Sequence, residues 1–209
     1  AQLVKDGTLD IKDINEESFK DYIGCKHAVA LNSCTAGLNL TLALQNFSEG
    51  DEVITTPMTF PATANAIHLQ RLKPVFADVE PGTLNIDPQK IEAKITARTR
   101  AIIPVHFAGH PCDMNAIQGL ADQHKLVIIE DAAHALESRY KGKKIGNLGN
   151  ATAFSFYANK NITTGEGGML VTNDDELAEN LRVLRLQGIS RDAWKRYGKS
   201  GFSHWEQTR

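Results

Sequence analysis

The sequence predicts an α/β domain with a mostly parallel sheet that helices cover on both faces. Its 209 residues are 42% hydrophobic and 23% charged, an ordinary globular composition that suffices for one substantial core. Short apolar runs of strand length alternate along the chain with longer segments of helical pattern. This alternation is typical of parallel sheets whose strands are joined by helices.

Local signals support this prediction along the first two thirds of the chain. Gly24 is a natural stop for a first short helix, and Pro57 ends the second strand. Asp87 followed by Pro88 is a helix start, with an N-cap and a proline at the first helical position. The expected strands are residues 27–31, 52–56, 74–79, 101–105 and 126–130, and the expected helices are residues 15–23, 38–46, 60–72, 88–95 and 113–124.

After residue 131 the pattern changes. Residues 140–146 are typical of a small hairpin, and residues 154–168 follow as a strand, a connection and a glycine turn into a second apolar strand. Asn173 or Asp174 caps a last helix that runs to about residue 187 and is closed by Gly188. No repeat or linker marks an internal boundary, so residues 1–209 are expected to form one domain.

Composition argues against several classes of protein. The net charge is -2 and no block of Lys or Arg occurs, whereas nucleic-acid binding needs clustered cations. No apolar run approaches the roughly 20 residues that span a bilayer, and the first residues lack a signal-peptide pattern. Three cysteines without CxxC spacing indicate reduced thiols. We therefore expect a cytoplasmic protein with a small, roughly neutral partner.

Lys160 lies on the connection between two predicted strands, among Asn, Thr and Tyr residues. Partial desolvation there would favour the neutral amine, a nucleophile that can form a Schiff base. Taken alone, a solvated surface lysine is the commoner interpretation.

Residues 32–37 are small and polar, and they join a strand to a helix. The free N–H groups and the dipole of a helix start can bind a phosphate, with Thr35 and Ala36 as the cradle. A simple N-cap is the alternative, and it is favoured when the segment is considered alone. Ser155, five residues before Lys160, could add a hydrogen bond to a phosphate or be only a solvated serine.

Asp131 directly follows a strongly apolar predicted strand. A carboxylate in that position is costly unless a cation meets it, and a protonated pyridine nitrogen is one such cation. An N-cap for the segment that starts at Ala132 is the alternative. Glu130 points to the opposite face of the sheet by the period of two. Phe60, just after a strand and flanked by small residues, could stack on a heteroaromatic ring or belong to the core.

A phosphate cradle, a stacking aromatic, a carboxylate for a pyridinium and a Schiff-base lysine are together what pyridoxal phosphate (PLP) requires. The sequence here resembles the DegT family of PLP-dependent sugar aminotransferases, which have the aspartate-aminotransferase fold (fold type I). The resemblance extends from about Ser18 to Tyr197. The motifs that carry it are residues 32–37, 59–65, 104–109, 130–135, 155–168 and 188–192.

The resemblance implies a role for each candidate residue. Lys160 would hold PLP covalently and move the proton, Asp131 would pair with the ring nitrogen, and Phe60 would stack on the ring. Thr35, Ala36 and Ser155 would hold the phosphate. His134 occupies a position where the family commonly has His or Gln, so it would lie beside the ring. No metal is expected, because Gly109 and Pro111 break any helix that could align His106, His110 and Cys112.

The resemblance also implies an activity. A PLP-dependent aminotransferase of this family would move an amino group from glutamate to a nucleotide-linked keto sugar, for the amino sugars of cell-surface polysaccharides. Residues 188–197 and His134 favour a 4-keto sugar. The alternatives are a keto-cyclitol acceptor and a non-catalytic PLP-binding regulatory protein; a plain nucleotide-binding α/β module lacks the GxGxxG fingerprint.

Complete family members are longer than this chain. They have a smaller C-terminal domain and work as homodimers whose active sites borrow residues from the partner. The two ends of this chain look cut, since Ala1 replaces an initiator Met and the last residues show no capping logic. We therefore expect the large, three-layer PLP-binding domain of a longer protein, without its small domain.

Overall fold

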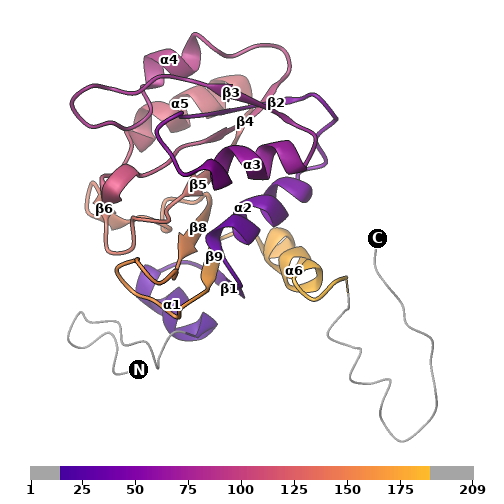
Figure 1. Ribbon diagram of the computed structural model, residues 1–209, viewed down its shortest axis with the longest axis vertical. Coiled ribbons are helices and arrows are strands. Elements are labelled where there is room, and N and C mark those ends of the chain that lie inside the picture. The colour runs from indigo at the N-terminus through magenta and orange to yellow at the C-terminus, as the bar shows by residue number, and fades with distance from the viewer. Residues whose placement is uncertain (1–14, 189–209) are drawn as a thin grey trace, which may run out of the picture.

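The computed structural model describes residues 15–188 of the chain. The centre of this part is a seven-stranded sheet (Figure 1). Its strand order is β1-β9-β8-β5-β4-β2-β3. Strand β9 is antiparallel to both of its neighbours, and all other neighbouring pairs are parallel, which confirms the mostly parallel sheet. The strands are β1 (His27–Leu31), β2 (Glu52–Thr55), β3 (Lys73–Phe76), β4 (Thr99–Ile103), β5 (Val127–Asp131), β8 (Ala151–Ser155) and β9 (Gly168–Thr172).

Helices cover both faces of this sheet. Helices α2 (Cys34–Ala43), α3 (Pro61–Leu69) and α6 (Asp175–Leu184) pack on one face, and α1 (Glu16–Ile23), α4 (Pro88–Glu92) and α5 (Met114–His124) pack on the other. The short hairpin of β6 (Arg139–Tyr140) and β7 (Lys143–Lys144) lies on the second side. Neighbouring residues of one strand alternate between these layers: Ile129 joins the α2–α3 core and Ile128 joins the α5 core. The three-layer α/β/α prediction is therefore confirmed.

Several expected boundaries are confirmed by their caps, and others shift by a few residues. The Asp87 side chain accepts the amide of Gln89, and of the two candidate caps for the last helix Asp174 is the one used. The last helix ends at Leu184 rather than near residue 187. The second helix begins earlier than expected, at Cys34, because Ser33 caps it by accepting the amide of Ala36. The expected small-residue turn is therefore largely the first turn of α2.

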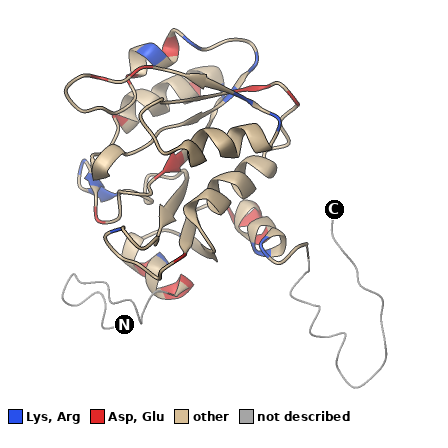
Figure 2. Cartoon of the chain, viewed as in Figure 1, with Lys and Arg blue, Asp and Glu red and all other residues tan. Residues whose placement is uncertain are grey.

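Charged side chains are spread over many elements. Figure 2 shows Lys and Arg residues on separate helices, strands and loops rather than gathered into one block. Some pair locally, as in the contact of 2.9 Å between Lys73 Nζ and Glu52 Oε1. None of the helices in residues 15–188 combines the length and the hydrophobicity that a membrane-spanning helix requires.

The first residue of β9, Gly168, lies against the N-terminus of α2. A Cβ on this residue would be 2.4 Å from the carbonyl carbon of Ser33 and 2.6 Å from the amide nitrogen of Cys34. These are backbone atoms, so a flexible side chain cannot relieve the clash. Gly168 therefore sets how closely the helix start approaches the sheet.

Gly168→Ala is expected to destabilise the protein by about 3 kcal/mol, because it forces the start of α2 away from β9. Gly119→Ala is the matched control: Gly119 lies in α5 with no atom within 4 Å of the added Cβ, so the change should stabilise by up to about 1 kcal/mol. Urea unfolding measures both. Equal unfolding midpoints for the two variants would contradict this account of Gly168.

Candidate active site

A cavity of about 850 Å³ opens at the carboxyl ends of β5 and β8 and at the first turns of α2 and α3. This is the edge at which ligands of open α/β sheets bind. Six of the seven residues selected from the sequence line it: Thr35, Phe60, Asp131, His134, Ser155 and Lys160. The seventh, Ala36, does not line the cavity, and its amide is bonded to Ser33 Oγ.

Asp131 is the last residue of β5, and its side chain is 5% exposed. Its Oδ2 accepts a hydrogen bond of 2.8 Å from the Thr63 hydroxyl, and its Oδ1 accepts one of 3.1 Å from the amide of Ala133. Within residues 15–188 it makes no ion pair. A buried carboxylate with neutral donors and free lone pairs is suited to a cationic ligand such as a pyridinium.

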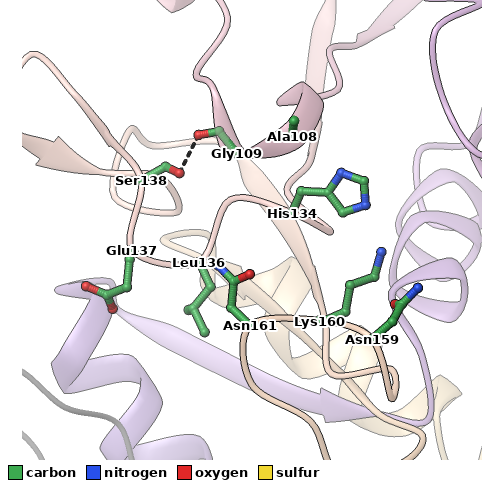
Figure 3. Close-up of a pocket in the computed structure, with 9 residues that line it drawn as sticks. All are labelled: Ala108, Gly109, His134, Leu136, Glu137, Ser138, Asn159, Lys160 and Asn161. Carbon is green, nitrogen blue, oxygen red and sulfur yellow. Dashed lines mark hydrogen bonds between the residues drawn. The ribbon is translucent and has the colours of Figure 1, made fainter.

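Lys160 lies on the connection between β8 and β9, and its side chain is half-buried. The connection turns through a hydrogen bond of 3.0 Å from the Lys160 amide to the carbonyl of Tyr157. No carboxylate of the described chain forms an ion pair with this amine. Figure 3 shows its side chain and that of His134 lining the same pocket. The amine is thus free to react with a ligand in the cavity.

The pKa of His134 depends on burial and on the charges of Lys160 and Asp131. Burial lowers the pKa of His134 from 6.5, the positive charge of Lys160 lowers it further, and the carboxylate of Asp131 opposes both. A lowered pKa keeps the imidazole neutral at pH 7. The ring can therefore accept or donate a hydrogen bond without adding a second positive charge beside the lysine.

The first turn of α2 has partly unused donors. Ser33 caps Ala36, so the N-cap interpretation holds, but the amide of Thr35 has no partner within the described residues. At the end of β8, the Ser155 hydroxyl accepts the amide of Tyr157 at 3.3 Å and can still donate its own proton. A phosphate near Thr35 and Ser155 would find an amide, a hydroxyl and the positive end of a helix.

Phe60 is the N-cap residue of α3, and its ring is 78% exposed. The alternative that it belongs to the core is therefore wrong. No side chain caps helix α3; Pro61 has no N–H to satisfy, and the amide of Thr63 donates to the carbonyl of Phe60 at 3.2 Å. A large apolar ring left uncovered at the mouth of a cavity is available to stack on a planar ligand.

A second, smaller pocket of about 470 Å³ adjoins the first and shares His134, Asn159 and Lys160 with it (Figure 3). Its wall is a pair of loops held together by the hydrogen bond from Ser138 Oγ to the carbonyl of Gly109. Gly109 has φ +85°, and a Cβ there would be 2.9 Å from the carbonyl oxygen of His134. The glycine thus allows this loop to support the backbone of His134.

Glu130 lies on the face opposite Asp131, as the period of two predicts, and is fully buried. Its Oε1 accepts the Asn150 amide and its Oε2 contacts His106 Nε2, both at 2.9 Å. Because His106 Nδ1 accepts the amide of Cys112, the ring proton lies on Nε2 and is donated to Glu130. His106 is fully used by this network, and residues 15–188 contain no group of His, Cys, Asp or Glu arranged to hold a metal.

Burial also shifts the pKa of Cys34, the cysteine beside the site. It raises the pKa of the Cys34 thiol well above its usual range, and the charge of Asp131 raises it further. The thiol is thus a neutral donor that lies 3.8 Å from Asp131 Oδ1 and 3.4 Å from the carbonyl of Ala153. Cys34 packs the base of the cavity and is not a nucleophile.

Reasoning from the sequence missed Thr63 and Thr59 as individual site residues. Both line the cavity, and Thr63 bonds Asp131 directly although the two lie 68 residues apart. The only available signal was their presence in the motif of residues 59–65, which does not distinguish a contact to Asp131 from helix packing. Of the motif at residues 188–192, everything after Gly188 lies outside the described residues, as do residues 189–197 of the segment used for sugar specificity.

The fold and this cavity define the class: the large domain of a fold type I PLP enzyme. The chain belongs to the DegT/DnrJ/EryC1/StrS aminotransferase family, whose model matches residues 11–204. The family is PLP-dependent, and the residues around the cavity fit that cofactor, because an unpaired amine, a buried carboxylate, free phosphate donors and an uncovered ring meet in one space.

Three similar proteins show the range of the relatives. The spore coat polysaccharide biosynthesis protein SpsC of Bacillus subtilis is 55% identical over 91% of this chain and 49% of its own length. GDP-perosamine synthase of Caulobacter vibrioides is 50% identical over 87% of this chain and 48% of its own. The structure of the Helicobacter pylori aminotransferase PseC, involved in pseudoaminic acid biosynthesis, has a TM-score of 0.83 and 39% identity over 93% of this chain and 50% of that one. The chain thus spans about half the length of its curated relatives.

In the cofactor-free protein, Lys160→Gln should raise the pKa of His134 toward ~6.5, because the positive charge that lowers it is removed while burial remains. NMR titration of the imidazole carbons measures this change. Lys90→Gln, which removes an exposed lysine of α4, is the matched control and should leave His134 unchanged. An unaltered or lower His134 pKa in Lys160→Gln would contradict the proposed proximity of the two charges.

Glu130→Ala should destabilise the protein by about 3 kcal/mol, because it leaves the buried donor of His106 and the half-buried donor of Asn150 without an acceptor. Glu130→Gln keeps one acceptor and should cost about 1 kcal/mol. Guanidinium unfolding of both variants separates these values. Wild-type stability of Glu130→Ala would mean that the network does not hold this face of the sheet.

Proposed function

We propose that the complete protein is a PLP-dependent aminotransferase that moves an amino group from glutamate to a nucleotide-linked keto sugar. The observation that carries this proposal is the meeting of Lys160 and Asp131 at one cavity in a chain of an aminotransferase family. Names of relatives support the sugar: one acts in polysaccharide biosynthesis and another makes a GDP-linked product. The same relatives support a role in cell-surface polysaccharides.

Each residue of the cavity has a part in the proposed reaction. PLP, when bound, supplies the ring that delocalises the electrons released at the substrate carbon. Lys160 holds the cofactor, takes the α-proton of the amino donor, and later returns a proton to the acceptor. Asp131 keeps a proton on the ring nitrogen, because its buried charge disfavours loss of that proton.

The remaining residues bind and orient. The Thr35 amide and the Ser155 hydroxyl hold the phosphate, Ala36 contributes through the dipole of the first turn, and Phe60 covers one face of the ring. Neutral His134 lies beside the ring and bounds the smaller pocket, where the substrates bind. Donor and acceptor use this pocket in turn, so ping-pong kinetics follow.

The acceptor is proposed to be a 4-keto sugar. This part rests on His134 and on the resemblance of residues 188–197 to those of enzymes that aminate the fourth carbon. Labelled glutamate offered with a panel of nucleotide-linked keto sugars and keto-cyclitols tests it. Transfer of label to a 4-keto sugar alone supports the proposal, and transfer to a keto-cyclitol alone replaces it.

The complete protein is proposed to work as a cytoplasmic homodimer with shared sites. Around the cavity, Phe60 and Tyr157 leave apolar rings 78% and 46% exposed, a surface that a second subunit would cover. Three free cysteines suit a reducing compartment. A homodimer of complete chains in sedimentation, with a site that closes only in the dimer, is the expected result.

In the complete protein, PLP should produce the visible absorption of a lysine-bound cofactor, and glutamate should convert it to the pyridoxamine form. Lys160→Ala should lack this absorption and lose amino transfer by about 10³-fold or more, because no other amine lies in the cavity of the described chain. Lys90→Ala should behave as wild type, since Lys90 is exposed on α4.

Two other results have defined meanings. A normal lysine-bound spectrum that glutamate cannot change would favour the regulatory, PLP-binding alternative. No lysine-bound spectrum in a folded, full-length protein would contradict the cofactor assignment and the role of Lys160.

A further inference from the structure

Thr63 lies in the first turn of α3, is 1% exposed, and makes two short hydroxyl contacts. Its Oγ1 lies 2.8 Å from Asp131 Oδ2 and 2.7 Å from Thr59 Oγ1. The carbonyl of Phe60 is a third neighbour, at 3.4 Å. Thr63 thus lies between Phe60, which is proposed to stack on the cofactor ring, and Asp131, whose carboxylate is proposed to meet the ring nitrogen.

The number of protons fixes the direction of these bonds. A hydroxyl has one proton to donate, and an ionised carboxylate can only accept. Three oxygens lie within reach of the Thr63 proton, and only that of Asp131 belongs to a carboxylate. Hydrogen bonds to a carboxylate are stronger than those to a neutral oxygen, so Thr63 donates to Asp131 rather than to the Thr59 hydroxyl or the carbonyl of Phe60. Thr59 must then donate its own proton to Thr63. The result is a directed chain from Thr59 through Thr63 to Asp131.

This chain restricts the carboxylate. Thr63 engages Oδ2 while the amide of Ala133 engages Oδ1, so rotation of the Asp131 side chain breaks at least one bond. The lone pairs that remain are available to the cavity that Asp131 lines. A carboxylate held at both oxygens can meet a ring nitrogen without losing further side-chain freedom on binding.

We propose that Thr63, supported by Thr59, is a positioning residue that fixes the Asp131 carboxylate for the ring nitrogen of the cofactor. The proposal rests on the proposed function for its second half, the ring. Its first half, the fixed carboxylate, holds in the cofactor-free protein and can be measured there.

Thr63→Val tests both halves in the complete protein, because valine keeps the shape and removes the hydroxyl. In the cofactor-free form, the Ala133 amide should exchange with deuterium about tenfold faster, since its acceptor is no longer held. With PLP, the dissociation constant should rise about tenfold. Thr63→Ser keeps the hydroxyl and should restore both values to within about threefold of wild type.

Thr41→Val is the matched control. Thr41 is also a fully buried threonine, but in α2, and its hydroxyl has no hydrogen-bond partner among the described residues. Its loss should change neither amide exchange at Ala133 nor PLP affinity. Thr59→Val, at a half-buried position, should shift both readouts in the direction of Thr63→Val by a smaller factor, and it serves as the test if Thr63→Val fails to fold.

The outcomes separate this proposal from the proposed function. Faster exchange at Ala133 without any PLP binding in the wild type would support the fixed carboxylate and overturn its link to the cofactor. Unchanged exchange in Thr63→Val, or a Thr63→Ser variant that behaves like Thr63→Val, would overturn the positioning role even if PLP binds.

Discussion

The burial of a carboxylate at the end of a central strand is the constraint on which the site depends. Asp131 is 5% exposed and has no ion-pair partner within residues 15–188, so donors must hold it. They come from three elements: the start of α3, the backbone after β5 and the start of α2. These hydrogen bonds to Asp131 therefore hold together three of the segments that line the cavity.

Glycine packing supplies the second constraint. Gly168 lets the backbone of Ser33 and Cys34 lie directly on β9, so the N-terminus of α2 faces the same sheet edge as Asp131. The strand that approaches it is the antiparallel one, which follows the connection bearing Lys160. The amine, the carboxylate and the helix start thus share one edge because of backbone contacts rather than long side chains.

Much of this arrangement could be predicted from the sequence, because apolar periodicity and caps are local signals. The strand and helix order, the role of Asp87 as a cap and the opposite orientation of Glu130 all follow from neighbouring residues. The bond from Thr63 to Asp131 could not be predicted, since it joins segments 68 residues apart. Nor does the sequence show that the amide of Ala36, predicted to belong to the phosphate cradle, is bonded to Ser33 Oγ.

The most direct test of the account is a crystal structure of the complete protein with PLP. The account predicts a covalent bond from Lys160 Nζ to the cofactor, the ring nitrogen hydrogen-bonded to Asp131, and the phosphate at Thr35 and Ser155. A cofactor bound elsewhere, or a ring nitrogen facing away from Asp131, would contradict the central claim that this buried carboxylate organises the site.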